Sequence, residues 1–297
     1  MSNTRINLTL DFDGPNPLVS PSRTSSNWRR LSLRNIAKLM WGIMHGSQFR
    51  TSGNSPKVTV QSSVVQAHAT ATPAAVQAAD TVSIGGTALT ATQGRASATC
   101  TTSSVQAGDT VTLNGVVFTA VNGAVVLGAA TFDCSGSNTA CATSIAAQVN
   151  AYASSKLSGL VAAKSASAVV TFYAVNVGTS GNGITLTSSS NTTLAVTGSG
   201  FLANGAALTN NQFDYIGTDI TTGTDLARAI NASTTAAVNQ TTAMVAASTG
   251  VVTVTALPPG VAGNAITFTS SSNTRLAVTG SGFLASGSAG APVQWSF

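Results

Sequence analysis

The chain has 297 residues, and charged residues make up only 7% of them, against roughly 25% in an ordinary soluble domain. All eight acidic residues are Asp, so acid and base chemistry is scarce, and a weakly charged surface offers little repulsion between copies. The composition therefore argues against an enzyme and favours a protein that assembles. The formal net charge of +5 is concentrated at the N-terminus, because residues 1–57 hold eight Lys or Arg and two Asp.

The hydrophobic fraction of 43% comes mainly from Ala and Val, which together with Ser, Thr, Gly and Asn suit strands and tight turns. The sequence has no apolar run near the roughly 20 residues that cross a bilayer. It also begins without the charged-then-apolar pattern of a signal peptide. We therefore expect synthesis in the cytosol and no insertion into a membrane.

The first 65 residues are expected to form an extended N-terminal arm. Alternating apolar residues predict a strand over residues 5–12. A second pattern predicts an amphipathic helix over about residues 32–45, with Gly46 as its C-terminal stop. The apolar positions are Ile6, Leu8, Leu10 and Phe12 in the strand and Leu33, Ile36, Ala37, Met40, Ile43 and Met44 in the helix.

The basic and aromatic residues of this arm are the candidate partner-binding surface. A strand, an amphipathic helix and a low-charge flank favour docking into another protein, with Trp and Arg as anchors. Contact with DNA and packing against the chain's own modules are the alternatives. The expected partner-binding residues are Trp28, Arg29, Arg30, Leu33, Arg34, Ile36, Met40, Trp41, Ile43 and Met44.

The most informative feature of the sequence is an internal repeat. Residues 181–205 read GNGITLTSSSNTTLAVTGSGFLANG and return at 263–287 as GNAITFTSSSNTRLAVTGSGFLASG, a shift of 82. Upstream, TSIAAQVN at 143–150 matches TDLARAIN at 224–231, a shift of 81. The chain thus contains two modules, each expected to run loop, short helix, strand, glycine turn, strand, strand.

Each module is expected to be α+β with strands dominant. The helix begins behind a Thr at 143 or 224 that can serve as N-cap. Its apolar positions are spaced three or four apart and are Ile145, Val149 and Tyr152 in one copy and Leu226 and Ile230 in the other. The glycine-rich segments 178–183 and 260–263 precede strands, so we interpret them as turns and not as phosphate-binding loops.

One asymmetry suggests that module one is inserted inside module two. Module one opens with a hairpin pattern at 108–120 around Asn114-Gly115, a strong two-residue turn signal. Module two lacks this pattern after Gly205, but a related one lies upstream at 80–91. The expected organisation is an arm (1–65), a linker (66–79), module two (80–91 plus 205–287), module one (92–204) and a C-terminal tail (288–297). The expected fold class is mainly β, with two β-sandwich-like modules.

The sequence offers little support for a catalytic, metal or cofactor site. Both histidines lie in the N-terminal part, away from the modules. Asp214, Asp219 and Asp225 are expected to make turns and caps, with a weak calcium site as the alternative. Cys134 and Cys141 flank a short loop; we expect reduced thiols, with a disulfide between these two as the alternative.

The pattern GDTVTLNGVVFTAV, a short Ala-rich helix (SIAAQVNAYA, TDLARAINAS), VVTVTALPPGVAGNAITFTSS and LAVTGSGFLASG resembles a module of tailed-bacteriophage virion proteins. The resemblance covers residues 80–287. It implies a virion structural protein assembled in the host cytoplasm, with the major capsid protein or other virion subunits as partners and with homo-oligomers, expected to be trimers.

Among virion roles, an arm ahead of two modules suits a capsid decoration or cement protein, whose arm docks on the shell. A tail tube, sheath or fibre component is the alternative within the virion. A bacterial surface adhesin built from β repeats is the alternative of another class, but adhesins require export and the chain shows no export signal.

Overall fold

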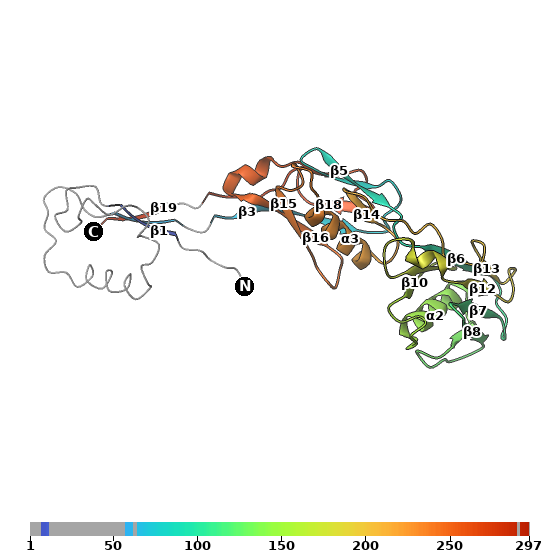
Figure 1. Ribbon diagram of the computed structural model, residues 1–297. Coiled ribbons are helices and arrows are strands. Elements are labelled where there is room, and N and C mark those ends of the chain that lie inside the picture. The colour runs from blue at the N-terminus through green and yellow to red at the C-terminus, as the bar shows by residue number, and fades with distance from the viewer. Residues whose placement is uncertain (1–6, 12–56, 62–63, 290–291, 297) are drawn as a thin grey trace, which may run out of the picture. The chain divides into compact units, whose positions relative to one another are not determined.

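The computed structural model describes residues 7–11, 57–61, 64–289 and 292–296 (Figure 1). The chain divides into two compact units, Met1–Val64 with Ala289–Phe297, and Val65–Ser288. The larger unit consists of two similar β-sandwich-like modules with one α-helix each. The expected fold class of repeated β-rich modules is therefore confirmed.

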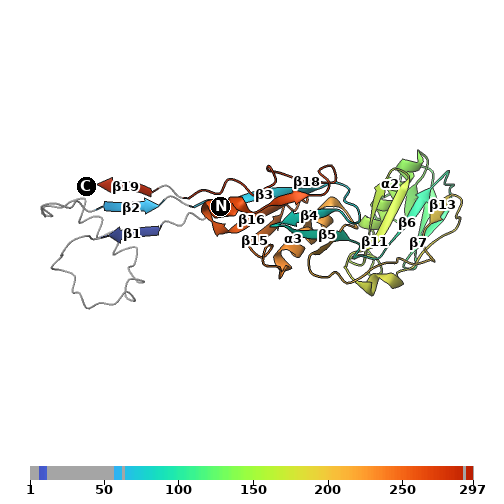
Figure 2. The same cartoon turned by 90° about the horizontal axis from the view of Figure 1, so that it is seen from above.

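The smaller unit contains a three-stranded antiparallel sheet in the order β1-β2-β19 (Figure 2). Its strands are β1 (Asn7–Asp11), β2 (Lys57–Gln61) and β19 (Pro292–Ser296). β1 falls within the strand expected over 5–12. The expected tail at 288–297 is wrong, because it contains β19, which pairs with β2 from the other end of the chain. The helix expected over 32–45 lies outside the described residues.

Module two contains two four-stranded sheets, ordered β15-β16-β3-β18 and β14-β5-β4-β17. The bounds are β3 (Gln66–Pro73), β4 (Thr81–Ile84), β5 (Thr87–Thr92), β14 (Gln212–Asp214), α3 (Asp219–Ala232), β15 (Thr241–Val245), β16 (Val252–Pro259), η3 (Gly260–Ala265), β17 (Phe268–Ser270) and β18 (Leu276–Val278). All pairs are antiparallel except β5–β14, which is parallel. The helix α3 packs against β14, β15 and β3.

Module one repeats the same topology, with sheets β10-β11-β6-β13 and β12-β7-β8-β9. The bounds are β6 (Ser97–Thr102), β7 (Thr110–Leu113), β8 (Val116–Val121), β9 (Thr131–Asp133), α2 (Asn138–Ala151), β10 (Val161–Ala166), β11 (Val169–Ala174), η2 (Thr179–Gly183), β12 (Leu186–Ser188) and β13 (Leu194–Val196). The one parallel pair described in this module is β8–β9, the counterpart of β5–β14.

The chain enters module two through β3, β4 and β5, builds all of module one, and returns to module two at β14. The hairpin β4–β5 pairs with β14 and β17, with Thr90 opposite Gln212 and Ile84 opposite Phe268. These pairings place the hairpin in module two, as the insertion hypothesis requires.

The linker expected over 66–79 is wrong, because residues 66–73 form β3, an inner strand of a module-two sheet. Its inward positions Ala67, Ala69 and Ala71 are buried. Alanine has a low strand propensity and carries a weak alternation signal, so burial between β16 and β18 decides this strand and local preference does not.

The α-helix of each module begins about one and a half turns earlier than expected. The side chains of Ser137 and Thr218 are the N-caps, accepting hydrogen bonds from the N–H groups of Ala140 and Thr221. The hydroxyl of Thr143, the expected cap, instead donates to the carbonyl of Thr139 one turn back inside the helix. The helical stretch before it is rich in Thr, Ala and Asn and has no apolar spacing to reveal it.

The turns follow glycine and asparagine positions that need positive φ. Asn114 and Gly115 have φ of 46° and 75°, and Gly85 and Gly86, which occupy the matching hairpin, have φ of 57° and 83°. Positive φ at both residues is the type I′ pattern that suits a two-residue hairpin. The segments expected as glycine turns are the 3-10 helices η2 and η3, each followed by a short strand.

Each module has its own apolar core. Phe118, Phe132 and Phe172 are fully buried in module one, and Phe213 and Phe268 are fully buried in module two. In module one the core combines both sheets with one face of α2, which supplies Cys141, Ala142, Ile145, Ala146 and Val149. The expected core positions Ile145 and Val149 are thus correctly placed.

Candidate functional site

Four charged side chains form a cluster where the chain passes from module two into module one. Arg95 lies in the crossing segment between β5 and β6, Asp214 ends β14, and Asp225 and Arg228 lie on α3. The Arg95 guanidinium donates to Asp214 at 2.5 Å and also to Asp225, while Arg228 donates to Asp225 at 3.1 Å. Side chains of Arg95, Asp214 and Asp225 are at most 8% exposed.

The backbone of the crossing segment completes the coordination of Asp214. One carboxylate oxygen accepts hydrogen bonds from the N–H groups of Gly94 and Arg95, at 2.5 and 3.1 Å. A Cβ on Gly94 would lie 2.9 Å from a methyl of Val177 and 3.0 Å from Leu208, so glycine allows the chain to come close enough. The Nε–H of Arg95 donates to the carbonyl of Val175 at 3.0 Å, and Nη1, the nitrogen that bonds to both carboxylates, also lies 3.4 Å from the carbonyl oxygen of Ile216.

Burial and pairing act in opposite directions on the ionisation of this cluster. Burial works to lower the pKa of Arg95, but hydrogen bonds and charge from Asp225 and Asp214 outweigh it and raise that pKa. Burial raises the pKa of Asp214, and its bonds to Gly94 and Arg95 partly offset the shift. Both carboxylates are thus paired with the buried guanidinium of Arg95, and Asp225 also pairs with the half-exposed Arg228.

Two further side chains extend this junction from the outer face of the sheet β10-β11-β6-β13. Lys164 on β10 donates to the carbonyl of Gly217 at 2.5 Å, and Tyr173 on β11 is only 5% exposed. Burial lowers the pKa of Lys164 and raises the pKa of Tyr173. The contacts join module one to the N-terminal end of α3.

Among the described residues, the equivalent place in module one has no counterpart of the buried ion pairs that Arg95 makes. Asp133, the counterpart of Asp214, accepts from the N–H of Gly123 at 3.0 Å as Asp214 does from Gly94. Its own N–H donates to Ser144, which stands where module two has Asp225. The carboxylate-to-loop contact therefore belongs to the shared fold, whereas the buried ion pairs are specific to the junction.

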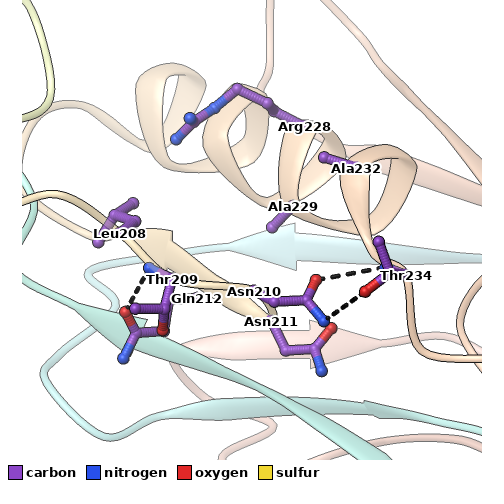
Figure 3. A pocket seen from close by; sticks show the side chains of 9 residues that line it. All are labelled: Leu208, Thr209, Asn210, Asn211, Gln212, Arg228, Ala229, Ala232 and Thr234. Carbon is purple, nitrogen blue, oxygen red and sulfur yellow. Dashed lines mark hydrogen bonds between the residues drawn. The ribbon is translucent and has the colours of Figure 1, made fainter.

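A shallow groove of about 300 Å³ lies beside the junction (Figure 3). Its walls come from the segment before β14 and from the last turns of α3, and its lining residues are Leu208, Thr209, Asn210, Asn211, Gln212, Arg228, Ala229, Ala232 and Thr234. The lining amides bond within the protein: Asn210 to Thr234 and Thr235, and Asn211 to Thr235. Hydrogen bonds within the protein therefore hold the walls of this surface groove in place, and the half-exposed Arg228 lies at its rim.

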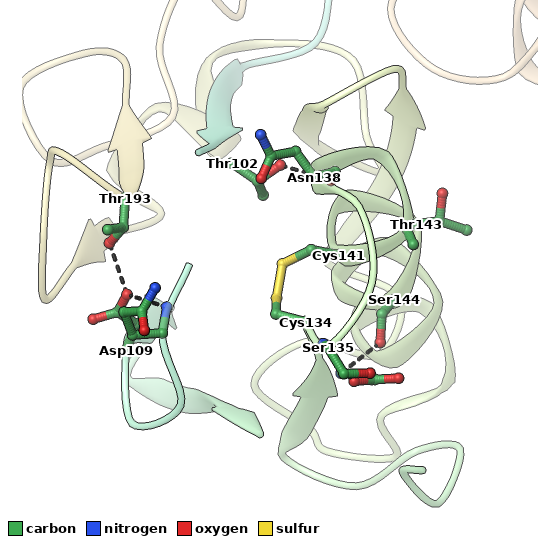
Figure 4. Close-up of a disulfide and its surroundings, with 12 residues drawn as sticks. Thr102, Asp109, Cys134, Ser135, Asn138, Cys141, Thr143, Ser144 and Thr193 are labelled. Atoms are coloured by element: carbon green, nitrogen blue, oxygen red, sulfur yellow. Dashed lines mark hydrogen bonds between the residues drawn. A yellow bond between two sulfur atoms is a disulfide. The ribbon is translucent and has the colours of Figure 1, made fainter. Parts of the chain in front are cut away.

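The structure joins Cys134 and Cys141 in a disulfide, the alternative that the sequence left open (Figure 4). The bond links the end of β9 to the first turns of α2, with a Cα–Cα distance of 4.4 Å. At the matching place module two has Tyr215 and Thr222, and the Thr222 hydroxyl donates to the Tyr215 carbonyl. The expectation of reduced thiols is thus wrong for this pair. Such proximity arises because the helix starts at Asn138 and brings Cys141 back over β9.

Cys100 is the free cysteine of the described residues and is buried on β6. Burial raises the pKa of its thiol to about 12. The thiolate is the reactive form of cysteine, so this side chain is an inert part of the module-one core.

The ten residues expected to bind a partner, from Trp28 to Met44, lie outside the described residues. The expected turn-and-cap role is wrong for Asp214 and Asp225, which are buried in ion pairs. Asp219 is the first residue of α3, but Thr218 is the N-cap, and the Asp219 carboxylate accepts from the N–H of Ala75 at 3.1 Å. Of the three carboxylates weighed for calcium, only Asp214 and Asp225 bond to Arg95. In residues 7–11, 57–61, 64–289 and 292–296, no group of three His, Cys or Asp is placed to hold a metal ion. Sequence reasoning missed Arg95, whose sole signal was its isolation in a charge-poor segment.

Comparisons with protein-family models, curated proteins and solved structures found no match to this chain. Among the described helices, none is long and apolar enough to cross a membrane.

Proposed function

We propose that this chain is a structural protein of a tailed-bacteriophage particle, a capsid decoration protein that stabilises the assembled head. The observation that carries the proposal is the hydrogen bonding of the acidic side chains in the two modules. Every carboxylate between Val65 and Ser288 accepts at least one hydrogen bond from the chain itself. The six acceptors are Asp80, Asp109, Asp133, Asp214, Asp219 and Asp225.

The consequence is that each of these six carboxylates has a hydrogen-bond partner within the chain. Acids that serve the fold are poor candidates for catalysis, and a surface with few free charges favours close association with other subunits. These properties suit a protein that covers a shell in many copies.

The division into two units supports the same role. Strands from both ends of the chain meet in the smaller unit, whereas the repeated modules form the larger one. In our proposal the smaller unit docks on the capsid shell, with the major capsid protein as partner. A protein that binds the assembled shell and not its dissociated subunits stabilises the assembly by linkage, about 2.7 kcal/mol per site at 100 times Kd.

The proposal is tested by cryo-electron microscopy of purified particles, combined with mass spectrometry of separated heads and tails. We expect many copies on the head, with residues 1–64 and 289–297 traced against the shell. Recovery of the chain in tails would retain the virion role and reject decoration in favour of a tail component. Absence from particles, with the chain exposed on a bacterial surface, would reject both and favour the adhesin.

A further inference from the structure

The near-identical segments 181–205 and 263–287 can be compared position by position, because they occupy equivalent places in the two modules. They differ at Gly183/Ala265, Leu186/Phe268, Thr193/Arg275 and Asn204/Ser286. By contrast, the equivalent helices α2 and α3 differ at most positions. The shared fold tolerates wide divergence, so it does not by itself explain why these segments are alike.

Some of the exposed residues that are identical in the two segments make hydrogen bonds within their own module. The hydroxyls of Ser189 and Thr197 accept hydrogen bonds from backbone N–H groups of β7 and β6, both at 2.8 Å. Ser271 and Thr279 do the same in module two, from β4 and β3, also at 2.8 Å. These residues hold the sheets together, and their identity needs no partner.

Three other pairs of exposed, identical residues, one of each pair in each module, make no such side-chain hydrogen bond to the sheets that the structure describes. We call these six residues the Phe–Thr surface. Phe201 and Phe283 are each 44% exposed. The neighbouring Thr and Ser hydroxyls are exposed and bond to no other side chain of the described residues. The Phe–Thr surface consists of Thr187, Ser199 and Phe201 in module one and Thr269, Ser281 and Phe283 in module two.

The backbone presents both phenylalanines in the same way. Gly198 and Gly280 have φ of 86° and 94°, and a Cβ on either would come within 3.1 Å of the carbonyl oxygen of the phenylalanine three residues on. The next residue, Leu202 or Leu284, is buried. A rigid glycine loop anchored by a buried leucine thus holds an exposed aromatic ring in each module.

We propose that the Phe–Thr surface binds a second copy of this chain, so that the chains associate through both modules at once. A second copy is the partner that necessarily presents the same surface twice at the same spacing. The surface has no charged residue of its own, so identical copies approach it without like-charge repulsion. When one module has bound, the other binds as an intramolecular event, which multiplies the affinity.

This inference does not rest on the proposed function, because chains can associate outside any particle. It is tested on the full chain by sedimentation velocity over a wide concentration range. The variants are Phe201→Ser, Phe283→Ser and the double variant. The matched control carries Val117→Ser and Met244→Ser, which remove one exposed apolar side chain per module, 49% and 75% exposed, outside the surface.

We expect the wild type and the control to form the same oligomer. Each single variant should raise the dissociation constant about tenfold or more, and the double variant should be monomeric throughout with an unchanged circular dichroism spectrum. A monomeric wild type would overturn the proposal, and binding of a neutral saccharide by that monomer would assign the surface to another ligand. A double variant that associates like the wild type, or a control that dissociates with it, would also overturn it.

Discussion

The guanidinium of Arg95 bonds to the carboxylate of Asp225, although 130 positions separate them in the sequence. Arg95 belongs to the segment that leaves module two, and Asp225 lies on a helix formed after the chain has returned. The ion pair therefore connects the segment where the chain leaves module two with α3, which forms after the chain has returned to module two.

We expect Arg95→Met to lower the free energy of unfolding by about 3–5 kcal/mol, because it leaves Asp214 and Asp225 buried with one guanidinium fewer. Urea unfolding followed by circular dichroism measures the loss. Adding Asp214→Asn and Asp225→Asn should recover a large part of it, since the uncompensated charges are removed. Arg228→Met is the control, and its half-exposed side chain should cost at most about 1 kcal/mol. Equal losses at Arg95 and Arg228 would contradict this account.

A second prediction concerns acid stability. Hydrogen bonds from Arg275 hold the pKa of Asp80 below its usual range. A lowered carboxylate pKa adds stability that is complete above the unfolded value of about 3.9 and is lost as the pH falls through the folded value. In module one Thr193 takes the place of Arg275 and donates to Asp109.

Arg275→Thr therefore imitates module one, and the folded pKa of Asp80 should rise toward its usual range. We expect the Tm difference between wild type and variant to be largest near pH 6 and to shrink as the pH falls below about 4. Thermal melts at a series of pH values measure it. A difference that stays constant down to pH 2 would show that Arg275 acts through packing alone.

The disulfide should stabilise module one without being needed for its fold. Module two closes the same place with Tyr215 and Thr222, so Cys134→Ser with Cys141→Thr should fold. For so short a loop, the chain-entropy account gives a loss of about 2–3 kcal/mol. Reductant should lower the Tm of the wild type and leave that of the double variant unchanged. If the double variant were as stable as the oxidised wild type, the disulfide would not stabilise module one.

Cys100 should resist thiol reagents in the native protein. With its pKa raised to about 12, the thiolate is scarce at pH 8, and burial blocks access. We expect no maleimide labelling of the oxidised native chain and one label per chain after unfolding. Labelling before unfolding would mean that module one opens readily around β6.

The sequence by itself determined the duplicated module, the type I′ hairpin at Asn114-Gly115 and the return of the hairpin pattern at 80–91, which led to the insertion hypothesis. These features are local or repeat-based, so the amino-acid sequence alone reveals them. It did not reveal β3, because alanines at inward positions carry little alternation signal. It also placed the helix starts too late, since Ser137 and Thr218 cap segments with no apolar spacing.

Only the tertiary structure decided which distant groups meet. Arg95 could be paired with any of the eight Asp from the sequence, and the pairing with Asp214 and Asp225 depends on β14 lying parallel to β5. The meeting of β19 with β2 and the bond between Cys134 and Cys141 likewise depend on where folded elements come to rest. Local propensity acts over a few neighbours, whereas these contacts form when burial of the two cores brings remote segments together.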